Sequence, residues 1–377
     1  MRRVQTILLS LLLVSVSVAG AQESQSVKQT LFMTFVPNVQ FSPVYAAIEN
    51  GHMADNGIVL EIEHGDENVG VDLIAANARQ FGLVSGEEII KARANGRPVV
   101  YVYEWFQKYP VGIVVSADSD IESVGDLTGR KVGIPGRFGA SFNGLIALLS
   151  ANDMQESDIQ LEPIGFNAPE VFCMGGVEAS VVYINNEPLQ IQQRAASGDC
   201  GQVSVVKVFP VSDAADMVSN GLVTNEQTIA EQPELVRGMV AAFDAGLRDV
   251  INNPAQAYLF SAAYVENLPM TDAFRDALEV AAAAQEEFLA ANPNRAAVAE
   301  SRAALLGTLT AGFDDATLIQ FRVLLATIDL WDANRLGYSE ASSWDVTQGV
   351  LIDMEFLKEP IDLSLAFTNE FVPAEGG

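Results

Sequence analysis

The chain has 377 residues, of which 49% are hydrophobic, so it is long enough for more than one domain and a large core. Its formal net charge of −28 disfavours contact with nucleic-acid phosphates and anionic lipids, and we expect no nucleic-acid partner. The two histidines, His52 and His64, show no metal-ligand spacing, so we expect both at the surface and predict no metal site.

The chain begins with a pattern typical of a secretory signal peptide, residues 1–21. Arg2 and Arg3 precede an apolar run at 7–18, and small residues at 19–21 form a cleavage site. We therefore predict cleavage after this site and an exported protein that is soluble in the periplasm or at the cell surface. The alternative is an uncleaved helix that holds the protein to the membrane, although the run is short for a membrane span.

From Thr30 onward, strand-like and helix-like stretches follow one another in turn. Strands are expected at 31–36, 58–64, 80–85 and 97–106, and helices at 42–50, 70–78 and 86–96. Pro43 in the first turn of the first helix and Gly96 at the end of the third suit helix ends. This alternation predicts a mostly parallel sheet with helices on its faces.

A second α/β unit follows. Its strands are expected at 131–135, 159–166, 179–185 and 202–209, and its helices at 141–151, 169–177 and 187–197. The remainder is expected to be chiefly helical, to about Gln348. We predict two lobes with a ligand cleft between them, connected through the strands 109–115 and 203–211. Lobe one combines residues 30–111 with 210–377, and lobe two is residues 112–209.

The chain contains two cysteines, Cys173 and Cys200. An exported protein can hold a disulfide between them. Two free thiols fit the sequence equally well, because spacing alone does not decide between the two states.

Candidate ligand contacts in lobe one begin at the carboxyl end of the first strand. Asn38 lies in the turn, and Phe41 and Tyr45 open the following helix, where their rings can stack on a planar ligand. Packing in the core is the alternative for both rings. Ser85 ends another strand, where backbone N–H groups can bind a carbonyl oxygen, while the two glutamates after it are also explained by helix capping.

The aromatic stretch before the second unit supplies two more candidates. Strand alternation puts Tyr103 and Trp105 on one face and Glu104 and Phe106 on the other. We favour Tyr103 and Trp105 as the pair that faces the cleft, and the opposite face is the alternative.

In lobe two, candidate contacts lie at two strand ends. Gly136, Phe138 and Ser141 belong to a glycine-containing loop and helix start, where unpaired N–H groups can bind a ligand carbonyl or hydroxyl. No Gly-Lys-Ser/Thr follows this loop, so it does not match a nucleotide-binding loop.

The second strand end in lobe two carries Tyr183, Asn185 and Glu187. An amide both donates and accepts hydrogen bonds, which suits the edge of a nitrogen heterocycle. A turn and a helix cap before Pro188 is the alternative role for these residues.

Several stretches, in this order, resemble the NMT1/THI5-like branch of the periplasmic substrate-binding proteins of ABC importers. They include "VPNVQFSPVYAAIENGHM" (36–53), "SVGDLTGRKVGIPG" (123–136), "EASVVYINNEP" (178–188) and "FTNEFV" (367–372). The resemblance covers nearly the whole chain after the signal peptide. It implies a type II periplasmic-binding-protein fold and a monomer that closes by hinge motion on a small heterocyclic ligand and then docks on a membrane permease.

The resemblance also implies the kind of ligand. The stretches 101–115 and 181–191 are most similar to the riboflavin-importer branch, so riboflavin is the expected transported ligand, and no cofactor is expected. Many family members have His-Ala-Pro where this chain has Phe41 and the two residues after it, and a phenyl ring suits a larger π-surface. A thiamine pyrimidine precursor is the alternative ligand.

An enzyme that makes this pyrimidine is the more distant alternative. Such relatives use a histidine and a cysteine-rich motif, whereas this chain has no histidine in the first turn and its two cysteines are far apart. We therefore expect no catalytic residues.

Overall fold

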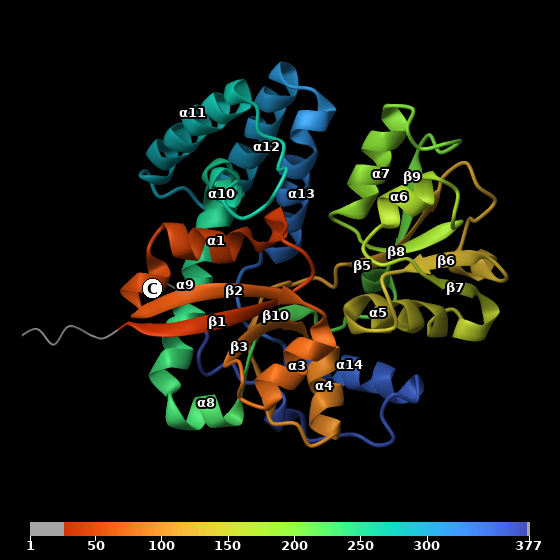
Figure 1. Ribbon diagram of the computed structural model, residues 1–377, viewed down its shortest axis with the longest axis horizontal. Coiled ribbons are helices and arrows are strands. Elements are labelled where there is room, and N and C mark those ends of the chain that lie inside the picture. Colours follow the sequence, from red (N-terminus) through yellow and green to blue (C-terminus); the bar gives the residue numbers. More distant parts are fainter. Residues whose placement is uncertain (1–25, 375–377) are drawn as a thin grey trace, which may run out of the picture.

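The computed structural model describes residues 26–374, so the predicted signal peptide lies outside the described part of the chain. The chain forms two five-stranded sheets flanked by helices (Figure 1). Sheet A has the strand order β2-β1-β3-β10-β4, with β1 at Val27–Thr34, β2 at Ile58–Gly65, β3 at Phe81–Ser85, β4 at Val99–Glu104 and β10 at Asn220–Asn225. Sheet B has the order β7-β6-β8-β5-β9, with β5 at Val111–Ser116, β6 at Lys131–Ile134, β7 at Gln160–Pro163, β8 at Ala179–Tyr183 and β9 at Val206–Pro210.

One strand in each sheet runs against the other four. β10 is antiparallel to β3 and β4, and β5 is antiparallel to β8 and β9. The remaining neighbours pair in parallel. The prediction of an α/β fold with mostly parallel sheets is therefore confirmed, whereas β10 lies in a part of the chain that was expected to be chiefly helical.

The helices of the α/β units lie close to their expected positions. They are α1 at Ser42–Glu49, α2 at His52–Asp55, α3 at Glu67–Ala75, α4 at Gly86–Ala94, α5 at Gly139–Ser150, α6 at Ala168–Cys173 and α7 at Glu187–Ala196. The C-terminal part adds α8 at Glu226–Glu231, α9 at Pro233–Asn252, α10 at Pro254–Ser261, α11 at Asp272–Leu289, α12 at Arg295–Gly312, α13 at Asp315–Trp331 and α14 at Ala341–Asp353.

Each sheet has its own hydrophobic core. Under sheet A, α1 packs on α9 so closely that a side chain at Gly246 would collide with the Pro43 carbonyl and the Ala47 methyl group. A second core fills the space between sheet B and α5, and it includes Ile113 in β5 and Leu145 in the helix. Two separate cores allow each sheet to keep its packing when the other moves.

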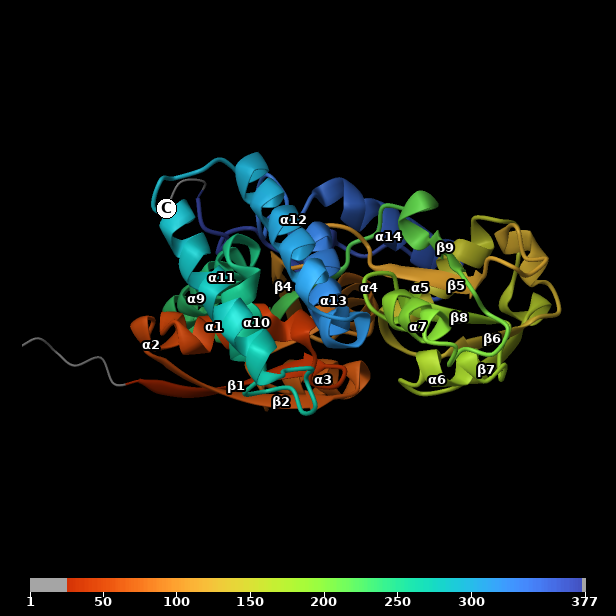
Figure 2. The ribbon, with the colours of Figure 1, turned by 90° about the horizontal axis from the view of Figure 1, so that it is seen from above.

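The chain passes between the sheets twice, through residues 105–110 and 211–219. The C-terminal helices contact both sides of this junction: α13 packs on α7, and α14 packs on α4 and α5. Figures 1 and 2 show α13 and α14 beside the junction of the two sheets. The edge of β4 is covered by two late segments, since Glu104 N donates to the Gly337 carbonyl and Tyr101 pairs with Phe367.

The two cysteines form a disulfide, which settles the alternative that the sequence left open. Cys173 at the end of α6 is bonded to Cys200 after α7, with 4.1 Å between their Cα atoms. Both residues are buried in a small cluster between sheet B and the helices α6 and α7.

Replacing both cysteines by serine should lower the free energy of unfolding by about 3–4 kcal/mol, because the bond closes a loop of 27 residues in the unfolded chain. The check is chemical denaturation of the oxidised protein and of the Cys173→Ser/Cys200→Ser variant. Equal unfolding midpoints with equal slopes would contradict the expected stabilisation.

Candidate ligand-binding site

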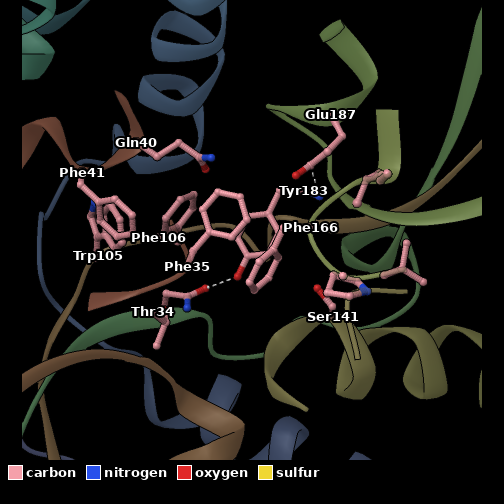
Figure 3. Close-up of a pocket in the computed structure, with 16 residues that line it drawn as sticks. Thr34, Phe35, Gln40, Phe41, Trp105, Phe106, Ser141, Phe166, Tyr183 and Glu187 are labelled. Carbon is pink, nitrogen blue, oxygen red and sulfur yellow. Dashed lines mark hydrogen bonds between the residues drawn. The ribbon is translucent and has the colours of Figure 1, made fainter. Parts of the chain in front are cut away.

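A cavity lies between the carboxyl ends of the two sheets (Figure 3). The cavity has a volume of about 70 Å³, and the empty space reaches about 640 Å³ only when the open mouth is counted. The lining residues are Thr34, Phe35, Gln40, Phe41, Trp105, Phe106, Pro135, Ser141, Gly165, Phe166, Ala168, Val181, Val182, Tyr183, Glu187 and Asn220. Six of these side chains are aromatic, and they come from both sheets.

Trp105 is the centre of the aromatic wall on the side of sheet A. Its ring lies 5.7 Å from Phe41, 4.7 Å from Phe106 and 5.6 Å from Trp331, measured between ring centroids. The indole Nε1 is buried and has no hydrogen-bond partner in the described structure. A rigid apolar wall with an unused donor suits a planar ligand that carries acceptor atoms.

Both Trp105 and Phe106 line the cavity because β4 ends before them. Their backbone N–H groups both donate to the Asn220 carbonyl, at 3.1 and 3.0 Å. Two consecutive donors on one acceptor end the alternation of the strand, so both side chains turn to the same side. Tyr103 still belongs to the strand, and its hydroxyl donates to Asp244 at 2.7 Å in the core of sheet A.

Phe35 lies at the centre of the cavity mouth. Its φ of 78° places a bulky residue in the left-handed region, which is a strained conformation. Its ring meets Phe166 of the opposite side edge-to-face, with 4.7 Å between centroids. This pair joins the two sides of the cleft, and Figure 3 shows both rings projecting into the cavity.

His64 supports the strained backbone of Phe35. Its Nδ1 lies 2.9 Å from the Phe35 carbonyl, so the neutral ring donates a hydrogen bond there. Burial lowers the pKa of His64 and outweighs the opposite effect of this hydrogen bond, which favours the neutral ring. His64, which was expected at the surface, is half-buried against Phe41.

Polar groups on the side of sheet B face this wall. The Tyr183 hydroxyl donates to Asn220 Oδ1 at 3.0 Å, across the two sheets. The Tyr183 N–H donates to Glu187 Oε2 at 2.8 Å, and burial raises the pKa of Glu187 to about 7. Gln40 Oε1 accepts from Asn185 Nδ2 at 3.0 Å, and this places the Gln40 amide at the edge of the cavity.

The structure brings five of the predicted site residues together. Phe41, Trp105, Ser141, Tyr183 and Glu187 all line the cavity. Phe138 lies beside it, in a smaller hollow that Ser141 and Tyr183 also line.

The other predicted residues lie outside this cavity. Tyr45 stacks on Tyr264 in the core at 4.3 Å, and Ser85 donates its N–H and hydroxyl to Glu67. Asn38 caps a short helical turn by accepting the N–H of Gln40, and it lines an outer hollow. Tyr103, Gly136 and Asn185 are likewise absent from the cavity wall, and Asn185 instead donates to Gln40 and Thr327.

Sequence reasoning missed Phe35, Gln40, Phe166 and Asn220. Phe35 could have been predicted from the sequence, since it lies near the end of the expected strand 31–36, just before the turn that contains Asn38. Phe166 comes directly after Gly165, which has a φ of 60°. In the sequence, a single glycine is only a weak signal for a cleft residue. Asn220 begins the strand that the sequence did not reveal.

Three glutamates are buried between the sheets beside the cavity. Glu87 accepts from the Tyr109 hydroxyl at 2.7 Å, and Glu88 accepts from Asn143 at 2.9 Å. Glu67 contacts Gly139 at the start of α5. Burial, followed by the charge of a neighbouring glutamate, raises the pKa of Glu67 to about 7 and that of Glu87 to about 8. The carboxyl groups of Glu67 and Glu87 therefore hold protons at pH values where exposed glutamates are ionised.

The protein should lose stability as the pH rises from about 4.5 to 8, because unfolding releases the proton of Glu87 in this window. Below the window both states are protonated, and above it the folded state carries a buried charge. Glu87→Gln should remove up to about 1.4 kcal/mol of this loss for each pH unit. Urea unfolding across the window measures the effect, with Glu300→Gln on exposed α12 as the control. If the free energy of unfolding changes with pH in the same way in both variants, Glu87 is not the group that causes the loss of stability.

Residues 26–374 contain neither a cluster suited to a metal ion nor a helix suited to a membrane span. No group of three or more His, Cys, Asp or Glu side chains is placed to hold a metal ion in that range. No helix within it is long and apolar enough to cross a membrane.

Two of the relatives of this chain show what it is similar to. It is 30% identical over 352 residues to the riboflavin-binding protein RibY of Chloroflexus aurantiacus, which covers 91% of this chain and 86% of the relative. It is 23% identical to 4-amino-5-hydroxymethyl-2-methylpyrimidine phosphate synthase of Legionella pneumophila, over 63% of this chain and 74% of the relative.

The fold is also found in solved structures. The periplasmic aliphatic sulphonate binding protein SsuA of Escherichia coli superposes with a TM-score of 0.59 and 14% identity, covering 90% of this chain and 91% of that chain. This likeness shows the periplasmic-binding-protein fold. The sequence model described as NMT1/THI5 like matches residues 38–257, more than half of the chain, and the chain therefore belongs to the NMT1/THI5-like family.

Proposed function

We propose that this protein is the extracytoplasmic substrate-binding protein of an ABC importer, and that it binds riboflavin between its two sheets and delivers it to the membrane permease. The observation that carries the proposal is the cavity whose aromatic rings come from both sheets. The similarity to RibY over most of both chains supports the choice of riboflavin.

The wall around Trp105 suits the isoalloxazine ring system, which is planar and three rings wide. Each well-placed aromatic partner contributes about 0.5–1.5 kcal/mol beyond the burial of its area. Trp105 Nε1, which lacks a partner, and the Gln40 amide supply donors for the ring edge, while Ser141 and Tyr183 suit the hydroxyl groups of the ribityl chain.

Binding and closure are coupled in this proposal. The two sheets are joined across the cavity by the Tyr183–Asn220 hydrogen bond, the Asn185–Gln40 hydrogen bond and the Phe35–Phe166 contact. A ligand held by both sides favours the closed arrangement, and the permease then distinguishes the loaded protein from the open one. The protein itself carries out no reaction.

The second candidate is a pyrimidine binder or pyrimidine-forming enzyme, which the similarity to the synthase favours. The enzymatic version is the weaker one. Both cysteines are bonded to each other and neither lines the cavity, and Phe41 stands where many family members have histidine. Calorimetric titration with riboflavin and with a methylaminopyrimidine separates the two candidates. Binding heat with the pyrimidine and none with riboflavin would exclude riboflavin as the ligand.

Trp105→Ala should weaken riboflavin binding about 10- to 100-fold, because the ring contributes stacking and buried area. Tyr183→Ala should also weaken it more than Glu187→Gln does. Quenching of flavin fluorescence measures all three affinities. Trp105→Leu keeps much of the packing if the alanine variant unfolds, and Phe313→Ala, in the helical part, is the matched control. Unchanged affinity in both Trp105 variants would exclude this wall as the flavin site.

Phe35 offers a test that separates strain from binding. Phe35→Gly should be more stable than Phe35→Ala by about 1–2 kcal/mol, because glycine adopts the left-handed conformation without strain. Both variants should lose riboflavin affinity to the same extent, because both lack the ring. Thermal unfolding and flavin titration give the two readouts. Wild-type affinity in Phe35→Ala would show that the ring does not contact the ligand.

A further inference from the structure

The acidic side chains that line the cavity and the hollows beside it have no basic side chain among them. Of the described residues that line these three spaces, none is Lys, Arg or His. The acids are Asp66 and Glu67 at one end and Glu170, Glu187 and Glu266 at the other. Phe35 and Phe166 line all three spaces, so the spaces adjoin one another.

The start of α5 would ordinarily attract an anion, because unpaired N–H groups and the helix dipole point into the cleft. Here the Glu67 carboxylate from the opposite side occupies the place. It contacts Gly139, the first residue of α5, so closely that any side chain at that position would collide with it. Glu67 is itself held by the Ser85 N–H and hydroxyl, at 2.5 and 2.7 Å.

Acidic side chains also lie in the first turns of two other helices at the cleft. Glu187 lies in the first turn of α7 and accepts the Tyr183 N–H. Glu87 and Glu88 lie in the first turn of α4. The protein's own carboxyl groups therefore lie at the helix starts where a phosphate or sulfonate would otherwise bind.

We infer that the cleft selects uncharged heterocycles and excludes their phosphate esters, so that it takes riboflavin and rejects riboflavin 5′-phosphate. This inference rests on the proposed function and adds the class of ligand. Whichever end the ribityl chain points to, a terminal phosphate would meet Glu67 or Glu187, with no cation among the lining residues to compensate. Like charges brought together in a closed site strongly disfavour binding.

The test compares two matched pairs by calorimetry, using the full exported chain at about pH 8, above the pKa of Glu67 and Glu187. The pairs are riboflavin with riboflavin 5′-phosphate, and a hydroxymethyl aminopyrimidine with its phosphate. The phosphate ester should bind at least about 100-fold more weakly than the alcohol. Glu67→Gln or Glu187→Gln should narrow this ratio about tenfold, while Glu300→Gln, which removes an exposed charge, should leave it unchanged.

The outcomes distinguish the two proposals. Binding of riboflavin and of its phosphate within about threefold of each other would overturn the inference and leave the proposed function standing. If riboflavin fails while the aminopyrimidine binds and its phosphate does not, the proposed ligand is wrong and the exclusion of anions is supported. Tight binding of either phosphate ester, or a ratio that neither glutamine variant changes, would overturn the exclusion. A chain that binds none of the four compounds would contradict both.

Discussion

Asn220 is the residue on which the geometry of the cleft depends. Its carbonyl accepts the N–H groups of Trp105 and Phe106, and its side chain accepts the Tyr183 hydroxyl of the opposite sheet. The first contact turns two aromatic rings into the cavity, and the second joins the sheets across it. Because Asn220 is also the first residue of β10, the inner strand of sheet A sets the position of both walls.

The α/β alternation could be predicted because most strands here are short, apolar and bounded by glycine or proline. β10 could not, because "NGLVTN" begins and ends with asparagine and offers too few apolar residues for a period to show. Its position between β3 and β4 is decided by tertiary pairing, which a local pattern does not contain.

The same limit applies to the candidate site. Phe41, Trp105 and Tyr183 were found because aromatic residues at strand ends are unusual, and all three line the cavity. Tyr103 was paired with Trp105 on the assumption that β4 continues, but the strand stops at Glu104. Tyr45 was also expected to contact the ligand, but its position on the helix places it in the core, where it stacks on Tyr264. Side-chain direction after a strand end depends on hydrogen bonds to distant residues, so it is visible only in the folded protein.

The order of strands in sheet A has a consequence for the time at which this chain can fold. Four of its strands are made before residue 105, but β10 between β3 and β4 is made only after the whole of sheet B, and the cover on β4 comes from residues beyond 330. During synthesis from the N-terminus, these four strands therefore lack the inner strand β10 and the cover on β4, while sheet B already holds most of its own core and can form first. The segment that is translated second is thus the one able to fold independently, and the segment translated first is completed last.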